Sequence, residues 1–257
     1  LWEDYLCHGY YGTVSHNVRA VYQRYLGFYD GHPSSLDPYE PVEAGQRYVD
    51  FMGGMDRLLE QARASYEAGD HRWVAEGLRH AVFADPTCDD ARLLQADAFE
   101  QLYQRAQALL KAQPQSAELH TWAGIIRGSQ AGAEGGLSAL SQVKDARAEF
   151  EQALAIDPTT LDGSAYTSLG TLYHQVPGWP ISFGDDDKAR QLLQKGLSLN
   201  PDGIDSNYFW ADFLHDQGDD AQARQALEKA MAAAPRPGRE TADAGRRQEI
   251  QALLSEI

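Results

Sequence analysis

The chain lacks the residues that hold together a small disulfide-linked or metal-linked fold. It contains only two cysteines among 257 residues, Cys7 and Cys88. Two cysteines so far apart predict neither a disulfide framework nor a zinc knuckle, and we interpret them as free thiols. The eight histidines never fall within two residues of one another. No closely spaced metal-ligand motif is present, so we expect no metal and no cofactor.

Positive charge is also scarce. Lysine and arginine number 22 against 38 aspartates and glutamates, which gives a formal net charge of −16. The acidic excess occurs in both parts of the chain, with 8 basic and 17 acidic residues up to position 103 and 14 and 21 after it. A surface of this sign repels phosphate backbones and anionic lipid, so we expect no nucleic acid partner and no membrane partner.

Long apolar runs are absent as well. None approaches the roughly 20 residues that a membrane span requires, and we expect no signal peptide. The chain is 43% hydrophobic, which is enough for one or two cores at this length. Because helical periodicity leaves little room for strands, the sequence predicts an all-α fold.

What is present is a long helical pattern over residues 89–113. Apolar residues recur every three or four positions, with no glycine or proline inside the run. At a rise of about 1.5 Å per residue such a helix is roughly 37 Å long. The apolar positions are Ala91, Leu94, Ala98, Leu102, Ala106 and Leu109. We predict one shared helix that joins two dissimilar halves.

Shorter helices are predicted before it, over residues 15–29, 41–53, 55–67 and 72–84. The first has a broad stripe of apolar and aromatic side chains, a composition that suits either a core or a subunit interface. Our candidate dimer interface consists of Val18, Tyr22, Tyr25, Leu26 and Tyr29.

Several segments of this first half match a known family. They are HGYYGTVSHN at residues 8–17, VRAVYQRYLGFYDG at 18–31, YVDFMGGMD at 48–56, AGDHRWV at 68–74 and FADP at 83–86. They resemble the alkylsulfatases of the metallo-β-lactamase superfamily, which hydrolyse dodecyl sulfate. The resemblance extends to about Leu102 and implies that residues 1–102 form the helical dimerisation domain of that family. It therefore implies a two-fold homodimer.

The resemblance does not bring the catalytic site of that family. Its dinuclear zinc centre needs a His-x-His-x-Asp-His cluster, in which several ligands converge on a water that two metals ionise. This sequence has no such cluster. We therefore predict no catalytic residues and no enzymatic activity, and we interpret His8 and His16 as structural. The families involved look secreted or periplasmic, and the sequence alone leaves the localisation undetermined.

The second half follows the arithmetic of tetratricopeptide (TPR) repeats. Such a repeat has small or apolar residues 12, 8 and 5 positions before a proline that ends its second helix. Three prolines obey this rule, and Pro201 and Pro235 are 34 residues apart, the standard period. The matching sets are Ala146, Phe150 and Ala153 before Pro158; Ala189, Leu193 and Gly196 before Pro201; and Ala223, Leu227 and Ala230 before Pro235. Residues 103–257 are therefore predicted to form a TPR-type α-solenoid.

Two of these repeats are longer than 34 residues. We predict that the first insertion, residues 129–136, is a glycine-rich loop. The second lies within residues 176–185, where proline and glycine prevent helix formation, and we expect Trp179 and Phe183 to fold back onto apolar surface. We interpret the acidic run at residues 185–187 as a helix N-terminus that complements the helix dipole.

The concave face of the repeats is the predicted binding surface. Aligning Leu169 and Trp210 to the repeat signature gives a candidate peptide groove consisting of Thr167, Thr171, His174, Tyr208, Asp212 and His215. A groove that binds a terminal carboxylate needs Lys, Arg and Asn there. Their absence disfavours that ligand, and other peptide or protein ligands stay open. This half, which has an insertion at residues 177–185, is similar to small exported bacterial TPR proteins.

The sequence supports one preferred interpretation and two alternatives. All five lysines follow position 110, and 10 of the 13 tyrosines precede position 104, which suggests two origins. The preferred interpretation is a noncatalytic homodimeric scaffold, designed by helical fusion of an alkylsulfatase dimerisation domain to a TPR domain. The alternatives are a natural TPR protein that binds an exported peptide or protein, and an alkylsulfatase fragment.

Overall fold

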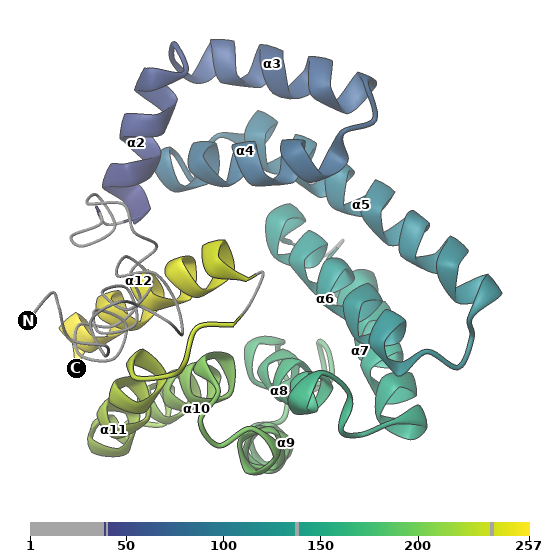
Figure 1. Cartoon of the computed structure of the whole chain (residues 1–257), viewed down its shortest axis with the longest axis vertical. Helices are drawn as coiled ribbons and strands as arrows, with labels where there is room; N and C mark the ends of the chain where they lie inside the picture. Colours follow the sequence, from purple (N-terminus) through teal and green to yellow (C-terminus); the bar gives the residue numbers. More distant parts are fainter. Residues whose placement is uncertain (1–38, 40, 137–138, 237–238) are drawn as a thin grey trace, which may run out of the picture.

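The computed structural model describes residues 39, 41–136, 139–236 and 239–257, in which every regular element is an α-helix. Figure 1 draws them as α2 (Pro41–Phe51), α3 (Met55–Glu67), α4 (His71–Ala84), α5 (Asp89–Ala112), α6 (Ala117–Glu134), α7 (Ala139–Ile156), α8 (Thr160–Gln175), α9 (Asp186–Leu199), α10 (Ile204–Asp216), α11 (Asp220–Met231) and α12 (Glu240–Glu256). No strand occurs among these residues, so the predicted all-α class is confirmed. The helix predicted over residues 15–29 lies outside the described residues.

Similar local signals end and begin helices in both halves of the chain. Gly69 has a φ of 81° and Gly218 a φ of 79°, a left-handed conformation that glycine adopts without steric cost. Each is followed by an aspartate that caps the next helix. The Asp70 carboxylate accepts a hydrogen bond from the Trp73 N–H at 3.4 Å, and Asp219 accepts one from the Gln222 N–H at 3.2 Å.

The helices pack as a series of antiparallel hairpins. The most extensive contacts join consecutive helices: α6 to α7, α8 to α9, α5 to α6 and α10 to α11. Alternate helices also contact one another, α6 with α8, α8 with α10 and α10 with α12. Hairpins stacked in this way form an α-solenoid, and Figure 1 shows them following one another along an arc.

Helix α5 is continuous and packs against helices that precede it and helices that follow it in the sequence. Ala91 and Ala98, near its start, lie in a core with Leu78 of α4. Ala106 and Leu110, near its end, pack with Ala123 of α6. Alternate helices contact one another before this point as well, α2 with α4 extensively and α3 with α5 less so. Helix α5 therefore contributes to the core that precedes it and to the core that follows it.

Small residues bring the helices close together. About half of the buried apolar residues in the described part of the chain are alanines, and several of them, such as Ala123 and Ala146, are completely buried. A Cβ added at Gly124 would lie 2.6 Å from the ring of Phe150. The cores are therefore thin layers between closely spaced helices rather than one large apolar centre.

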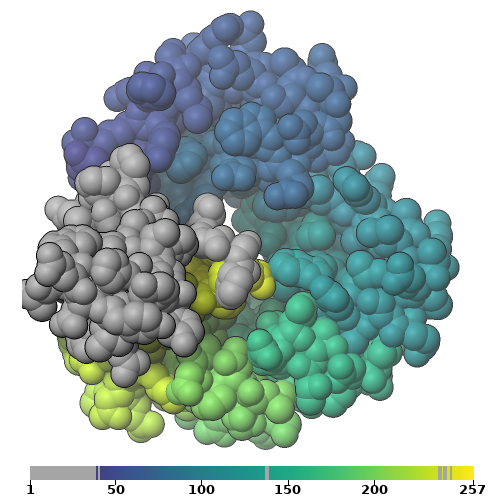
Figure 2. Space-filling view, in the orientation of Figure 1, coloured from purple at the N-terminus to yellow at the C-terminus, as the bar shows by residue number. Residues whose placement is uncertain are grey.

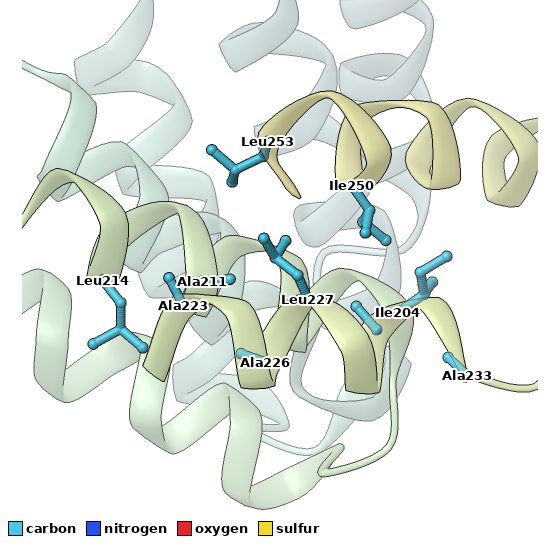
Figure 3. Close-up of a cluster of buried hydrophobic side chains, with 10 residues drawn as sticks. Ile204, Ala211, Leu214, Ala223, Ala226, Leu227, Ala233, Ile250 and Leu253 are labelled. Atoms are coloured by element: carbon cyan, nitrogen blue, oxygen red, sulfur yellow. The ribbon is translucent and has the colours of Figure 1, made fainter. Parts of the chain in front are cut away.

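The last helix, α12, packs on the final hairpin and also approaches helices from earlier in the chain. Ile250 and Leu253 of α12 are 0% and 8% exposed and lie in one core with Leu227 of α11, as Figure 3 shows. At its other end α12 approaches helices far away in the sequence. The Arg239 guanidinium lies 5.1 Å from the centre of the Trp122 ring of α6, and Gly245 lies beside the Arg79 side chain of α4.

Two expectations about the insertions were wrong. Residues 129–134 are not a loop, because α6 continues to Glu134 and ends at Gly135, which has a φ of 68°. Ala131 in this segment is 4% exposed and packs against Val143, and this burial offsets the cost of about 1 kcal/mol for each glycine in a helix. In the second insertion Phe183 does fold back onto Tyr173, but Trp179 is 90% exposed.

Candidate interaction surfaces

The six residues predicted to line a groove lie on the neighbouring helices α8 and α10. Thr167 is only 6% exposed, and its hydroxyl lies against Gly196 of α9. The Thr171 hydroxyl donates a hydrogen bond to the Thr167 carbonyl oxygen at 3.0 Å. Thr167 is therefore packed between α8 and α9, since the small residue at position 196 leaves room for it there, and it adds little to any surface.

His174 joins α8 to the two helices that follow. Its Nδ1 lies 2.9 Å from an Asp186 carboxylate oxygen and its Nε2 lies 2.9 Å from one of Asp216. Both ring nitrogens donate only in the protonated imidazole. Burial lowers the pKa of His174, but the hydrogen bonds to Asp186 and Asp216 outweigh it, so the pKa lies above its ordinary value. The Gln217 amide donates to Asp186 at 3.1 Å and completes this contact.

The rest of α10 continues this acidic edge. The Nδ1 of His215 lies 2.7 Å from an Asp220 carboxylate oxygen, and this hydrogen bond raises the pKa of His215. Burial, followed by the neighbouring charge of Asp216, raises the pKa of Asp212 above its ordinary value. The ends of α8 and α10 and the starts of α9 and α11 therefore form one edge, rich in aspartate, along which the histidines serve as counter-charges.

Tyr208 lies in a different environment. The Arg246 guanidinium of α12 is 4.3 Å from the centre of its ring. Burial, and then the charges of Glu249 and Asp212, raise the pKa of Tyr208 to about 12. The six predicted residues are therefore split among the α8–α9 interface, the acidic edge and the contact with α12.

A buried polar network holds α12 in place, and sequence reasoning did not find it. Asp243 is 0% exposed, and its carboxylate accepts hydrogen bonds from the backbone N–H of Arg236 at 2.8 Å and from its Nε at 2.7 Å. Arg236 also donates to Asp205 of α10 at 2.6 Å, and Arg246 donates to the same carboxylate at 2.8 Å. Burial alone would raise the pKa of Asp205, but Arg246 and Arg236 hold it below its ordinary value.

The described part of the chain offers few features that suggest other functions. None of its helices is long and apolar enough to cross a membrane. Within the same residues, no group of three or more His, Cys, Asp or Glu side chains is arranged to hold a metal ion. The surfaces that remain to be explained are therefore apolar or acidic.

Exposed apolar side chains are concentrated before α6. Phe51 at the end of α2 is 91% exposed, the highest value among the large apolar residues described. The others in this region are Tyr39, Val42, Tyr48, Trp73, Leu93 and Leu109, all between 46% and 54% exposed. The five residues predicted to form a dimer interface, Val18 to Tyr29, lie outside the described residues. Among the described residues, the range 39–112 holds seven of the nine large apolar side chains that are exposed.

Comparison with known proteins accounts for this same segment. Residues 1–113 match the alkyl sulfatase dimerisation family. Over 101 residues the chain is 62% identical to the (R)-specific secondary-alkylsulfatase of Pseudomonas sp., an alignment that covers 39% of this chain and 15% of that enzyme. An alkyl/aryl-sulfatase of Saccharomyces cerevisiae is 48% identical over 108 residues, covering 42% and 17%. The chain thus spans less than a fifth of the length of these relatives, and its similarity to them lies in the alkyl sulfatase dimerisation domain.

The solved structures with some similarity to this chain include a sulfatase and a TPR protein. A double mutant of the sec-alkyl sulfatase PisA1 is 62% identical over 37% of this chain and 15% of its own, with a TM-score of 0.30. A thermophilic TPR protein of Thermus thermophilus aligns with 78% of this chain and 98% of its own, with 16% identity and a TM-score of 0.49. The chain is thus similar to the alkyl sulfatase dimerisation family over residues 1–113, and its described helices stack as a solenoid of hairpins.

Proposed function

We propose that this chain is a noncatalytic homodimeric scaffold, in which an alkylsulfatase-type dimerisation module pairs two copies and holds a TPR-type array on each. The observation that carries this proposal is helix α5. Its first half packs on α4 and its second half on α6, and it ends at Ala112, one residue before the end of the family match at residue 113. A shared helix without a flexible linker transmits a fixed orientation from one module to the other.

The same helix supports our proposal for the domains and their origin. Residues 1–102 constitute the dimerisation module and residues 103–257 the repeat array, with α5 belonging to both. A join inside one continuous helix is the expected product of a helical fusion, and we propose that the chain was made in this way. Joining two modules through a continuous helix requires only that the apolar stripes of both be kept in register.

Self-association is supported by the family match and by the exposed apolar residues. Both lie in the region before α6. Isolated apolar residues on a surface need no explanation, but seven in one region of 74 residues (39–112) are typical of a surface that another subunit covers.

The mass of the protein in solution tests this proposal. We expect sedimentation equilibrium at micromolar concentration to give twice the 28.4 kDa of one chain. The substitution Phe51→Asp, and Tyr25→Asp in the predicted interface, should shift the mass toward the monomer because a buried charge without a partner is costly. Trp179→Asp is the matched control, because Trp179 is equally exposed but lies in the other region. A monomeric mass for the unmodified chain would contradict the proposal.

The absence of catalysis is tested separately. The sequence has no His-x-His-x-Asp-His cluster, and two adjacent zinc ions need several convergent ligands. We expect no stoichiometric zinc by elemental analysis after dialysis, and no release of sulfate from dodecyl sulfate when zinc is added. Metal-dependent sulfate release by the purified chain would overturn this part of the proposal.

A further inference from the structure

The loop between α8 and α9 presents two apolar side chains to solvent. Trp179 is 90% exposed and Ile181 is 60% exposed, and no other large apolar residue described after α5 is mostly exposed. They lie within the insertion of residues 176–185, which a 34-residue repeat does not need. The turn between α10 and α11 makes the same connection with only Gln217, Gly218 and Asp219.

Backbone hydrogen bonds give this loop a defined shape. A bridge pairs Gly178 with Gly184, and the Gly184 N–H donates to the Pro177 carbonyl oxygen at 3.0 Å. The N–H groups of Ile181 and Ser182 both donate to the Gly178 carbonyl oxygen, at 3.1 and 3.2 Å. A Cβ at position 184 would overlap the Val176 carbonyl oxygen, so only glycine fits there.

One aromatic residue anchors the loop to the solenoid. The Phe183 ring packs edge-on against Tyr173 with centroids 5.2 Å apart, and the Arg147 guanidinium lies 5.0 Å from the Phe183 centroid. The Asp185 N–H donates to the Tyr173 carbonyl oxygen at 2.9 Å. Because Phe183 anchors the loop, the loop backbone holds Trp179 and Ile181 on the outside. A loop backbone that is ordered before binding loses less entropy when it binds.

Aspartates outnumber the cations around the loop, where Arg147 lies against Phe183 and Lys188 against Tyr173. The Gly178–Gly184 bridge places Trp179 and Asp185 at the same end of the loop, each one residue beyond the paired glycines. Asp185 and Asp187 are exposed at the start of α9, and Asp216 lies on the neighbouring edge of α10, where it shares His174 with Asp186. An apolar projection is thus combined with negative charge.

We propose that Trp179 and Ile181 insert into an apolar pocket of a protein partner whose rim carries lysine or arginine. A rigid aromatic residue that enters a desolvated pocket is typical of an interface hot spot, and opposite charges around it orient the two proteins. A second copy of this chain fits poorly, since its net charge is also −16. Anionic lipid is repelled for the same reason. This surface does not depend on the dimerisation proposed above.

A model peptide tests the proposal. The probe is a fluorescent amphipathic helix of leucine and lysine about five turns long, and the control probe has glutamate in place of lysine. We expect the chain to bind the lysine peptide and not the glutamate peptide. The double variant Trp179→Ala/Ile181→Ala should bind at least about tenfold more weakly. Both side chains are exposed, so the variant keeps its fold.

A matched variant and two vesicles complete the experiment. Gln115→Ala removes an exposed side chain from the turn between α5 and α6, away from both proposed surfaces, and should leave the affinity for the lysine peptide unchanged. Vesicles of phosphatidylcholine, with and without phosphatidylglycerol, should bind neither protein. The proposal is overturned if the lysine peptide fails to bind, if the double variant binds it as tightly as the unmodified chain, or if vesicles bind through Trp179.

Discussion

The regions before and after α5 differ in how many of their large apolar side chains are covered. In the region after it, α12 covers the last hairpin with Ile250 and Leu253, and a buried network around Asp243 fixes it there. In the region before it, α2 ends with Phe51 almost fully exposed, and large apolar residues stay accessible on α4 and α5. Both regions use closely packed helices, so the difference concerns what covers them. The last hairpin is covered by α12, whereas the described residues before α6 keep large apolar side chains exposed, as we expect for a surface that a second subunit covers.

The largest expected effect on stability comes from rotating one region relative to the other about the axis of α5. One alanine inserted after Tyr103 turns everything beyond it by about 100° relative to α4, because a helix advances 3.6 residues per turn. Ala106 and Leu110 would then face away from Ala123 of α6. We expect a loss of roughly 5 kcal/mol or more in the free energy of unfolding, equivalent to two or more core truncations.

Urea denaturation followed by circular dichroism measures this loss. The control is an alanine inserted after Gln115, in the turn between α5 and α6, where no helical register is transmitted. If the insertion after Tyr103 is tolerated as well as the control, the two regions are not rigidly coupled through α5.

A second prediction concerns α12 and the buried polar network that holds it at the end of the array. Asp243→Ala leaves the Arg236 backbone N–H without its buried acceptor and leaves the Arg236 guanidinium with Asp205 as its only carboxylate partner. Removal of one member of a buried ion pair costs about 3–5 kcal/mol. Hydrogen exchange should show faster exchange in α11 and α12, with α2 to α4 unaffected. Equal acceleration in α2 to α4 would mean that the two regions unfold as one unit.

A third, smaller effect probes the region before α5. A Cβ at Gly45 would lie 2.8 Å from the His80 carbonyl oxygen and 2.9 Å from the Ala84 nitrogen, both in the backbone of α4. Overpacking of this kind costs about 1–3 kcal/mol, against a helix propensity gain of about 1 kcal/mol. We expect Gly45→Ala to lower the midpoint of urea denaturation.

Gly77→Ala is the control for that substitution. Gly77 also lies inside a helix, but no atom is within 4 Å of its added Cβ, so the alanine should stabilise the protein by up to about 1 kcal/mol. A Gly45→Ala variant as stable as Gly77→Ala would show that α2 moves freely away from α4.

The smallest effect is a pH dependence at the acidic edge. The pKa of His174 is raised by Asp186 and Asp216 despite burial. Its contribution to stability is therefore present below its unfolded pKa and is lost as the pH rises through the raised pKa of the folded state. Both aspartates are more than half exposed, so solvent screens the pair and we expect at most about 1 kcal/mol.

Comparison of the unmodified chain with His174→Gln measures that contribution. The difference in their free energies of unfolding should be larger at about pH 5.5 than at about pH 8.5, and added salt should reduce it. A difference that grows with pH would contradict the assignment of His174 as a protonated link.

Periodicity and local signals predicted the helices well, because they depend on near neighbours in the sequence. The pattern over residues 89–113 corresponds to α5, and the helices predicted over residues 55–67 and 72–84 correspond to α3 and α4. Glycine content misled us over residues 129–134, since the burial of Ala131 outweighs local propensity. Local composition alone therefore does not reveal where an insertion lengthens a helix.

Features that depend on distant contacts were harder to predict. The repeat signature did not reveal that Thr167 is buried, because this depends on the small residue Gly196 of α9. The pairing of Asp205 with Arg236 and Arg246 spans 31 and 41 residues and has no period. The dense run of charges from Arg236 to Arg247 was a usable signal, since charges that are to be buried need partners.

Because alanines fill its helix interfaces, the protein tolerates mutations that reduce side-chain volume better than mutations that increase it. At a position such as Ala146, the only smaller residue is glycine, so a mutation that reduces volume removes one methyl group and leaves a small cavity. Any enlarging mutation there pushes two helices apart along their whole contact. Most random substitutions of alanine are enlarging. Evolutionary drift or mutagenesis should therefore damage these interfaces mainly by adding atoms, and compensation should arise through a smaller residue on the facing helix.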